Sequence, residues 1–290
     1  MSAPDLSRLS DADLMRLERE IAREHMGHFP YFAVFWGFSN LAVWLALWPL
    51  VFTGLVPLWL GFIVATLCVT LSYLPSHEAQ HDIIARPGER LRWLNEALGH
   101  LSIVPLMLPY RVAKLTHLEH HKHTNDPMLD PDYSVTASGP WSAIWTSIRN
   151  RQPRVDGGLK AYRGTLQRIG RDDVILDAVV YEIVFFGALF ALAWTGHAVE
   201  AALLWWLPRH IGLTYIQYYL SWAPHHPGNE TGRYRNTRSF RALLGNIGSL
   251  GMQYHVVHHL HPRIPLCRNP AAYWALKPVL EARGARVDAL

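Results

Sequence analysis

Two long apolar stretches dominate the pattern of hydrophobic and polar positions along this chain. Residues 31–76 contain no Asp, Glu, Lys or Arg, and a turn signal at residues 54–57 divides this stretch. A second apolar block covers residues 174–222, with a break near residues 195–200. A helix needs roughly 20 apolar residues to cross a bilayer. The pattern therefore predicts four transmembrane helices, two in each block.

The polar segment before the first apolar stretch has the pattern of one amphipathic helix. Ser10 and Asp13 fit a capping box at its start. Leu14, Leu17 and Ile21 then recur at helical spacing on one face. The segment lacks the basic start and apolar core of a cleavable signal peptide. We expect a helix that lies on the membrane surface.

The composition agrees with a membrane protein, because half of the 290 residues are hydrophobic and only 17% are charged. Lys and Arg concentrate in residues 77–173 and 223–290, whereas the turns between paired spans contain none. By the positive-inside rule, both basic regions and both termini are expected in the cytoplasm, as in a multi-pass protein of the inner (cytoplasmic) membrane. Basic loops beside anionic headgroups explain the net charge of +4, so no nucleic-acid partner is expected.

Histidine provides the candidate chemistry. Three short clusters place imidazoles at i, i+3 or i+4 spacing, which aligns them on one face of a helix. The eight histidines are His77, His81, His117, His120, His121, His255, His258 and His259. All three clusters fall in regions expected on the same side of the membrane. Eight convergent imidazoles are too many for one ion, so the sequence predicts a site for two metals.

These elements predict an all-α membrane protein with four transmembrane helices and a cytoplasmic helical cap that holds the histidine-rich di-metal site. Two cysteines allow neither a disulfide framework nor a cysteine zinc site. No repeat or linker divides the chain, so we expect one domain. Its parts are an N-terminal amphipathic helix (1–29), spans one and two (31–76), a cap segment with the first two clusters (77–173), spans three and four (174–222) and a tail with the third cluster (223–290).

A membrane zinc metalloprotease is a distant alternative, because His77, Glu78 and His81 also fit the H-E-x-x-H motif. In that motif two histidines bind zinc and the glutamate is the general base. Such a site needs one further ligand and a bound water. It would leave the other two histidine clusters without a role, so the di-metal interpretation accounts for more of the sequence.

In combination, the three clusters resemble the histidine boxes of the integral-membrane fatty acid desaturase and hydroxylase superfamily, which includes carotenoid ketolases and hydroxylases. The match extends over about residues 31–275 and includes Asp130-Pro131-Asp132 after the second box. The resemblance implies two iron ions ligated by the eight box histidines, with dioxygen as co-substrate. It also implies a further ligand at His225, with His226 as the alternative, and an iron-bound water held by Asn246.

The resemblance further implies an oxidoreductase that acts on lipid hydrocarbon, and we expect a fatty-acyl desaturase. A carotenoid ring hydroxylase or ketolase is the alternative, because the boxes do not identify the substrate. The lipid or acyl substrate is expected to reach the site from the bilayer. With two cysteines and no dinucleotide-binding motif, the chain needs a separate electron donor. A ferredoxin or a cytochrome b5 type with its reductase would dock on the basic face.

Other charged residues are candidates for supporting roles. Four carboxylates could orient ligand imidazoles or instead form turns and caps: Asp82, Asp126, Asp130 and Asp132. His123 and His261 are expected near the site without binding metal. Within the spans, Glu182 and Arg209 are expected to pair, the alternative for Arg209 being a contact with the polar end of a substrate.

Overall fold

The computed structural model describes residues 6–152, 158–287 and 289–290, so the first five residues of the expected N-terminal segment lie outside it. The described residues form helices and no strand. In chain order the helices are η1 (Leu6–Arg8), α1 (Asp11–His25), α2 (Tyr31–Phe52), α3 (Leu58–Leu71), α4 (Tyr73–Gln80), α5 (Arg92–Ser102), η2 (Val104–Leu106), α6 (Tyr110–His123), η3 (Tyr133–Val135), α7 (Pro140–Asn150), α8 (Gly158–Arg168), η4 (Asp172–Val174), α9 (Ile175–Trp194), α10 (Ala198–Ala201), η5 (Ala202–Trp206), α11 (Leu207–Ile216), η6 (Gln217–Trp222), α12 (Gly245–Gly248), η7 (Met252–Tyr254), α13 (His255–Leu260), η8 (Leu266–Arg268) and α14 (Asn269–Ala282).

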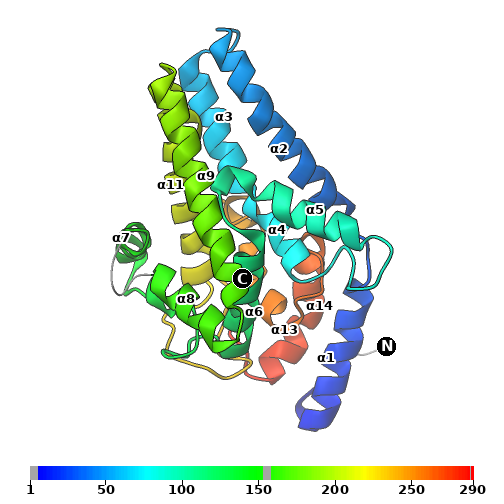
Figure 1. Ribbon diagram of the computed structural model, residues 1–290. Coiled ribbons are helices and arrows are strands. Elements are labelled where there is room, and N and C mark those ends of the chain that lie inside the picture. The colour runs from blue at the N-terminus through cyan, green and yellow to red at the C-terminus, as the bar shows by residue number, and fades with distance from the viewer. Residues whose placement is uncertain (1–5, 153–157, 288) are drawn as a thin grey trace.

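The apolar helices α2, α3, α9 and α11 extend together toward one end of the molecule, and most of the other helices lie toward the opposite end (Figure 1). Within the described residues, three segments are long and apolar enough to cross a membrane: Tyr31–Phe52, Leu58–Gln80 and Asp172–Trp194. The chain turns between α2 and α3 and again after α9, where the sequence predicts breaks. The second segment includes both α3 and α4, so it carries the first histidine cluster at its end.

The region of the fourth expected span is helical but irregular, and it is not among these three segments. It consists of α10, α11 and two π-helical segments, η5 and η6. Pro208 has no N–H to donate to the carbonyl of Leu204. That carbonyl oxygen instead accepts a hydrogen bond from Trp44 Nε1 of α2, at 3.2 Å. The proline thus interrupts the regular helix and frees a backbone group that fastens it to α2.

Aromatic packing and close backbone contact join the apolar helices. The Trp205 ring lies 5.5 Å from that of Trp44 and 5.1 Å from that of Phe185, both in edge-on arrangements. Gly212 of α11 approaches α3 so closely that an added Cβ would lie 3.3 Å from the backbone nitrogen of Thr70. Small residues allow this approach between apolar helices, where there is no water to drive association.

The N-terminal helix begins as the sequence predicts, because Ser10 Oγ accepts a hydrogen bond from the backbone N–H of Asp13. The buried face of this helix is covered by another helix, and its place on the membrane surface stays a prediction. The buried side chains of α1 are Leu14, Glu18 and Ala22, and this face packs against α14. Hydrophobic periodicity identifies the buried face of a helix but not the surface that covers it.

The end of α4 is held in place by α5 and α6. The carbonyl oxygen of Ala79 accepts hydrogen bonds from Asn95 Nδ2, at 3.0 Å, and from Tyr110 Oη, at 2.9 Å. Ser76 Oγ donates to the carbonyl oxygen of Gly99 at 2.8 Å. These buried bonds fix the helix that carries the first histidine cluster relative to the helix that carries the second.

We predict that Gly99→Ala lowers the stability of the protein. A Cβ on Gly99 would overlap the fully buried ring of Tyr110, which has no room to move. Overpacking of this kind costs about 1–3 kcal/mol. Thermal and denaturant unfolding in detergent should show the loss. Gly164→Ala on α8 is the matched control, because its added Cβ meets nothing within 4 Å. Equal stability of the two variants would contradict the packing argument.

Candidate metal centre

The three histidine clusters and His225 come from four separate segments and meet in one pocket. His77 and His81 lie at the end of α4, the second cluster on α6 and the third on α13. His225 follows η6 in the turn after the fourth apolar helix region. Of the nine side chains, six are buried and three are half-buried: His117, His121 and His259. Histidines far apart in sequence are therefore brought together, as the spacing predicts.

Within this pocket the imidazoles form two groups. His77, His81, His117 and His258 offer ligand nitrogens that all lie within 4.8 Å of one another. His120, His225 and His259 do the same in a second group.

The two remaining box histidines lie between or beside these groups. The Nε2 of His121 lies 3.1 Å from that of His117 and 3.0 Å from that of His258. The His255 ring lies 4.6 Å from that of His259 and 5.3 Å from that of His225. The pocket can therefore supply ligands to more than one ion.

The nitrogen chemistry of this pocket fits bound transition-metal ions. Both ring nitrogens of His77 and of His255, and Nε2 of His259, are buried and have no hydrogen-bond partner within the described part of the chain. Buried polar atoms are normally satisfied, so such nitrogens need another partner. Burial, together with the neighbouring imidazoles, holds the pKa of His117 and of His258 well below the ordinary value. Neutral imidazole is the form that binds metal.

A carboxylate orients one imidazole of the second group. His120 Nδ1 donates to Asp130 Oδ1 at 2.8 Å, and both groups are buried. Burial alone would lower the pKa of His120, but the Asp130 carboxylate outweighs it and raises the pKa to about 9. With Nδ1 donating, Nε2 of His120 points to Nε2 of His225, 3.2 Å away. A partner of this kind fixes the ring of a metal ligand and strengthens its basicity.

The other two imidazoles of the second group have weaker partners of the same kind. His225 Nδ1 donates to the carbonyl oxygen of Asn236 at 3.1 Å. His259 Nδ1 lies 3.4 Å from Thr124 Oγ1. Each ring of the group is thus oriented through the nitrogen on its far side.

The other three candidate carboxylates do not contact an imidazole. Asp82 binds Lys114 and Arg92, Asp126 accepts bonds from two backbone N–H groups of its own turn, and Asp132 accepts from Tyr162 Oη. Their sequence positions beside the boxes do not distinguish them from Asp130, because all four follow histidines closely. Asp130 differs from the other three in the direction that its loop faces, and this direction depends on the folded structure.

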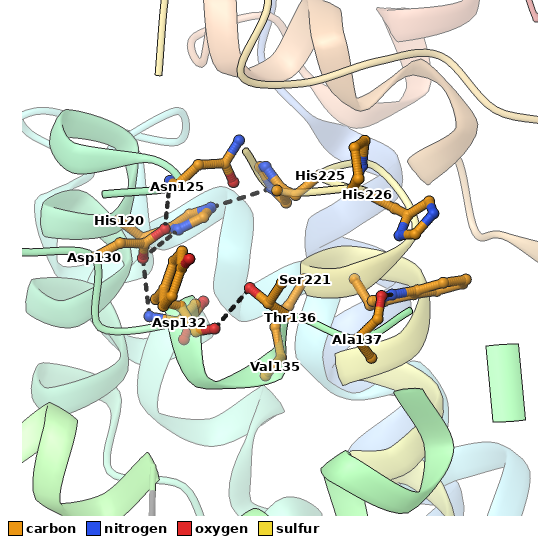
Figure 2. Close-up of a pocket in the computed structure, with 14 residues that line it drawn as sticks. His120, Asn125, Asp130, Asp132, Val135, Thr136, Ala137, Ser221, His225 and His226 are labelled. Carbon is orange, nitrogen blue, oxygen red and sulfur yellow. Dashed lines mark hydrogen bonds and ion pairs between the residues drawn. The ribbon is translucent and has the colours of Figure 1, made fainter. Parts of the chain in front are cut away.

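The neighbours of the boxes are placed outside the two groups. His123 Nε2 lies 3.6 Å from Glu119, and His261 Nε2 lies 3.0 Å from Glu18. Figure 2 shows His225 beside His120, whereas His226 lies apart, where its ring contacts Trp222. Asn246 is exposed on α12, and its role in holding an iron-bound water stays a prediction.

Two residues that the sequence did not single out follow the second box, and one of them, Asn125, ties the box to the segment after His225. Thr124 Oγ1 donates to the carbonyl oxygen of His120 at 2.7 Å. Asn125 donates its backbone N–H to Asp130 and its side-chain Nδ2 to the carbonyl oxygens of Glu230 and Asn236 (Figure 2 shows the first bond). Its φ of +67° lies in the left-handed region, which asparagine tolerates better than most residues. The sequence signal that could have identified Asn125 is an asparagine just after the helix that carries the second box.

Glu78, the general base of the metalloprotease alternative, is engaged elsewhere. Its Oε1 accepts a hydrogen bond from the backbone N–H of Leu266 at 2.9 Å, which ties the first box to the segment after the third. The two histidines of that motif also share their group with His117 and His258. A zinc protease site would hold a third ligand and a water at this position.

A cavity of about 540 Å³ extends from the histidines between the apolar helices. Its lining includes His117, His120 and His255, many apolar side chains, and Glu182 with Arg209. The predicted pairing of Glu182 with Arg209 is wrong, because within the described residues they form no ion pair. Arg209 Nε instead donates to the carbonyl oxygen of Leu106 at 2.8 Å. The two residues lie on the same cavity wall, but Glu182 is exposed on α9.

Comparison with known proteins agrees with this geometry. Residues 53–290 match the family model described as "Fatty acid desaturase". An "sn-1 acyl-lipid omega-3 desaturase (ferredoxin)" from Nostoc sp. (strain 36) is 24% identical, over 77% of this chain and 69% of that protein. A "Delta(9) fatty acid conjugase-like enzyme" from Dimorphotheca sinuata is 25% identical, over 72% and 65%. A "Zeaxanthin 4-ketolase" from Chlamydomonas reinhardtii is 27% identical, over 71% and 43%. The chain thus spans less than two thirds of the last two relatives.

We predict that Asp130→Asn lowers the apparent affinity of the full chain for ferrous or cobaltous ion by about 10–100-fold, because the His120 ring loses a charged acceptor. Titration of the metal-stripped protein against a chelator measures this affinity. Asp126→Asn is the matched control, since an amide oxygen can accept the same two backbone bonds in that turn. Equal affinities for the two variants would contradict the role of Asp130.

Proposed function

Because the chain belongs to the fatty acid desaturase family, we propose that it is a membrane oxidoreductase that uses two iron ions and dioxygen to oxidise a lipid hydrocarbon chain, as a fatty-acyl desaturase. The observation that carries this proposal is one pocket of nine histidines, seven of which form two groups that could each hold a metal ion, at the end of a cavity between apolar helices. The first iron would be held by His77, His81, His117 and His258. The second would be held by His120, His225 and His259, with His121 and His255 completing the two sets.

The chemistry explains why such a site belongs beside an apolar cavity. An alkyl C–H bond is not broken by acid or base groups, so iron and dioxygen would supply the oxidant. Desaturation removes two hydrogens from adjacent carbons while one dioxygen is reduced to two waters. The balance requires two further electrons from a donor and two protons from solvent. In this arrangement the chain's own residues hold the hydrocarbon in place and exclude water from the site.

The proposal includes a topology in which α10, η5, α11 and η6 form a fourth span and the histidine groups face the cytoplasm, with both termini. The basic residues after residue 76 and after residue 222 support this orientation. A separate ferredoxin or a cytochrome b5 type with its reductase would deliver the electrons. The name of the Nostoc relative includes ferredoxin, which supports a ferredoxin as the electron donor.

A carotenoid ketolase or hydroxylase is the second candidate, and the similarity to a zeaxanthin ketolase favours it. The same site would then insert oxygen into a C–H bond, with one atom of dioxygen leaving as water and the same demand for two electrons and two protons. The donor set of nine imidazoles serves both reactions. The substrate that fills the cavity decides between them.

We predict that expression of the full chain, together with a ferredoxin and its reductase, introduces a double bond into host acyl lipids. Mass spectrometry of lipids and carotenoids would show a loss of two hydrogens in the acyl products. His258→Ala should abolish the product, because it removes a ligand from the first group. His123→Ala is the matched control, because that imidazole lies outside both groups and contacts Glu119.

The metal content of the same preparations provides a second measurement. The unchanged protein should hold about two iron ions per chain, and His225→Ala should lower this to about one. Oxygen insertion into a carotenoid with acyl lipids unchanged would favour the ketolase. Neither product, with two iron ions bound and the electron donor supplied, would contradict the proposal.

A further inference from the structure

The cavity that reaches the histidine groups has a second polar region, which is cationic. Arg151, at the C-terminus of α7, and Arg209, on α11, both line it. Arg151 contacts Gln217, which precedes His225 by eight residues, roughly 12 Å at the 1.5 Å rise of a helical residue. The two arginines therefore lie well away from the histidine groups along the same cavity.

Arg209 keeps part of its guanidinium available to the cavity. Its Nε donates to the carbonyl oxygen of Leu106, and its central carbon lies 4.9 Å from the centre of the Phe185 ring. Within the described residues its two terminal nitrogens have no hydrogen-bond acceptor and no carboxylate lies within ion-pair distance. The contacts with Leu106 and Phe185 fix the direction of the side chain but do not neutralise its charge.

Among the described residues, the groups that hold Arg151 are all neutral. Its terminal nitrogens donate to Ser147 Oγ and to Thr214 Oγ1, each at 2.7 Å, and to the side-chain oxygen of Gln217. Its Nε is buried without a partner in the described part of the chain. Burial and repulsion from Arg209 lower the pKa of Arg151 to about 10, so it is still charged at neutral pH. Ordered contacts thus hold a cation that has no counter-ion among the described residues.

Two neighbouring positive charges beside an apolar cavity destabilise each other and are costly to bury unless a negative charge offsets them. Glu182 lines the same cavity, and its charge attracts Arg209 from a distance, but among the described residues it forms no ion pair with either arginine. Guanidinium groups bind carboxylate and phosphate oxygens through paired N–H donors. An anion in the cavity would supply the missing counter-charge.

The surroundings of Arg151 indicate the depth of this region in a membrane. On α7, Trp141 is 84% exposed and Trp145 is 60% exposed, and with Ile148 they form one apolar helix face. Tryptophan on such a face is typical of the layer of lipid headgroups. The opposite side of α7 packs against α11 and η6. This places Arg151 where the charged end of a membrane lipid lies.

On the basis of the proposed function, we propose that Arg151 and Arg209 bind the anionic end of an acyl substrate, a carboxylate or a phosphate, while its hydrocarbon chain occupies the cavity toward the histidine groups. The enzyme then selects acyl substrates with a charged end over neutral lipids of the same length, carotenes included.

Equilibrium binding of radiolabelled ligands to the full chain in neutral detergent at pH 8 tests this proposal. Oleate is expected to bind at least about tenfold more tightly than methyl oleate, which has the same chain without the charge. Arg151→Met and Arg209→Met should each weaken oleate binding at least about tenfold and change methyl oleate binding less than about twofold. Arg209→Lys should keep a preference for oleate, because it keeps the positive charge.

Two further variants serve as controls. Arg149→Met removes an exposed arginine two residues from Arg151 that does not line the cavity, so oleate binding should not change. Glu182→Gln removes a negative charge from the cavity wall, so oleate binding should tighten or stay the same. Unchanged thermal unfolding and metal content of the variants would show that they are folded.

Equal binding of oleate and methyl oleate by the unchanged protein would overturn the proposal, and so would an equal loss of both ligands in the arginine variants. Monooleoyl phosphate separates the two sources of the anion: tighter binding than oleate indicates a phospholipid end, and weaker binding a free carboxylate. The binding assay needs no turnover. Selective oleate binding without any lipid product would therefore contradict the proposed function but not the anion site. A lipid product without selective oleate binding would contradict the anion site but not the proposed function.

Discussion

The architecture depends on one constraint, which is that nine imidazoles from four segments share a buried pocket. Burial removes the water that would satisfy their nitrogens, and several of these nitrogens have no partner within the described chain. Burial also keeps most of the rings neutral, so they do not repel one another as cations would. Bound metal ions would supply the missing interactions and add their binding energy to the folded state. The same residues that would perform the chemistry therefore also decide whether this pocket is stable.

Buried hydrogen bonds between the segments hold the pocket in shape. Ala79 is bound by α5 and α6, Glu78 by the segment after the third box, and Asn125 joins the second box to the chain after His225. Most of these bonds use backbone groups near helix ends, where the normal helical partners are missing. Helix ends thus have two roles: they carry histidines, and they provide the backbone groups whose hydrogen bonds fix the histidine segments. The apolar helices contribute a scaffold and the cavity, but few of these bonds.

Much of this arrangement could be predicted from the sequence, and the exceptions have a common physical cause. Helical spacing places His117, His120 and His121 on one face, and the absence of charge identifies residues 31–76 as membrane-crossing, because both signals are local. Which of four nearby aspartates contacts an imidazole, or what covers α1, depends on segments that meet only in the folded chain. The sequence predicts that Glu182 and Arg209 lie at similar depth, and both residues do line one cavity. The depth of a residue along a helix does not show which direction its side chain faces around the helix axis. Arg209 therefore donates to the carbonyl oxygen of Leu106 and not to the carboxylate of Glu182.

The two polar regions of the cavity together have a consequence for where oxidation occurs. A hydrocarbon chain offers many equivalent methylene groups, and dispersion contacts along a smooth apolar wall distinguish poorly between neighbouring carbons. A fixed end removes this ambiguity, because the distance from the arginines to the histidine groups then determines which carbons reach the oxidant. Arg151 is well suited to this role, since four contacts with neutral groups hold it rigidly. A π-helical segment begins at Gln217, and its wider turn alters the rotation between Gln217 and His225 relative to a regular helix. The irregular geometry of this region thereby sets the relation between the site that would anchor the substrate and the site that would oxidise it.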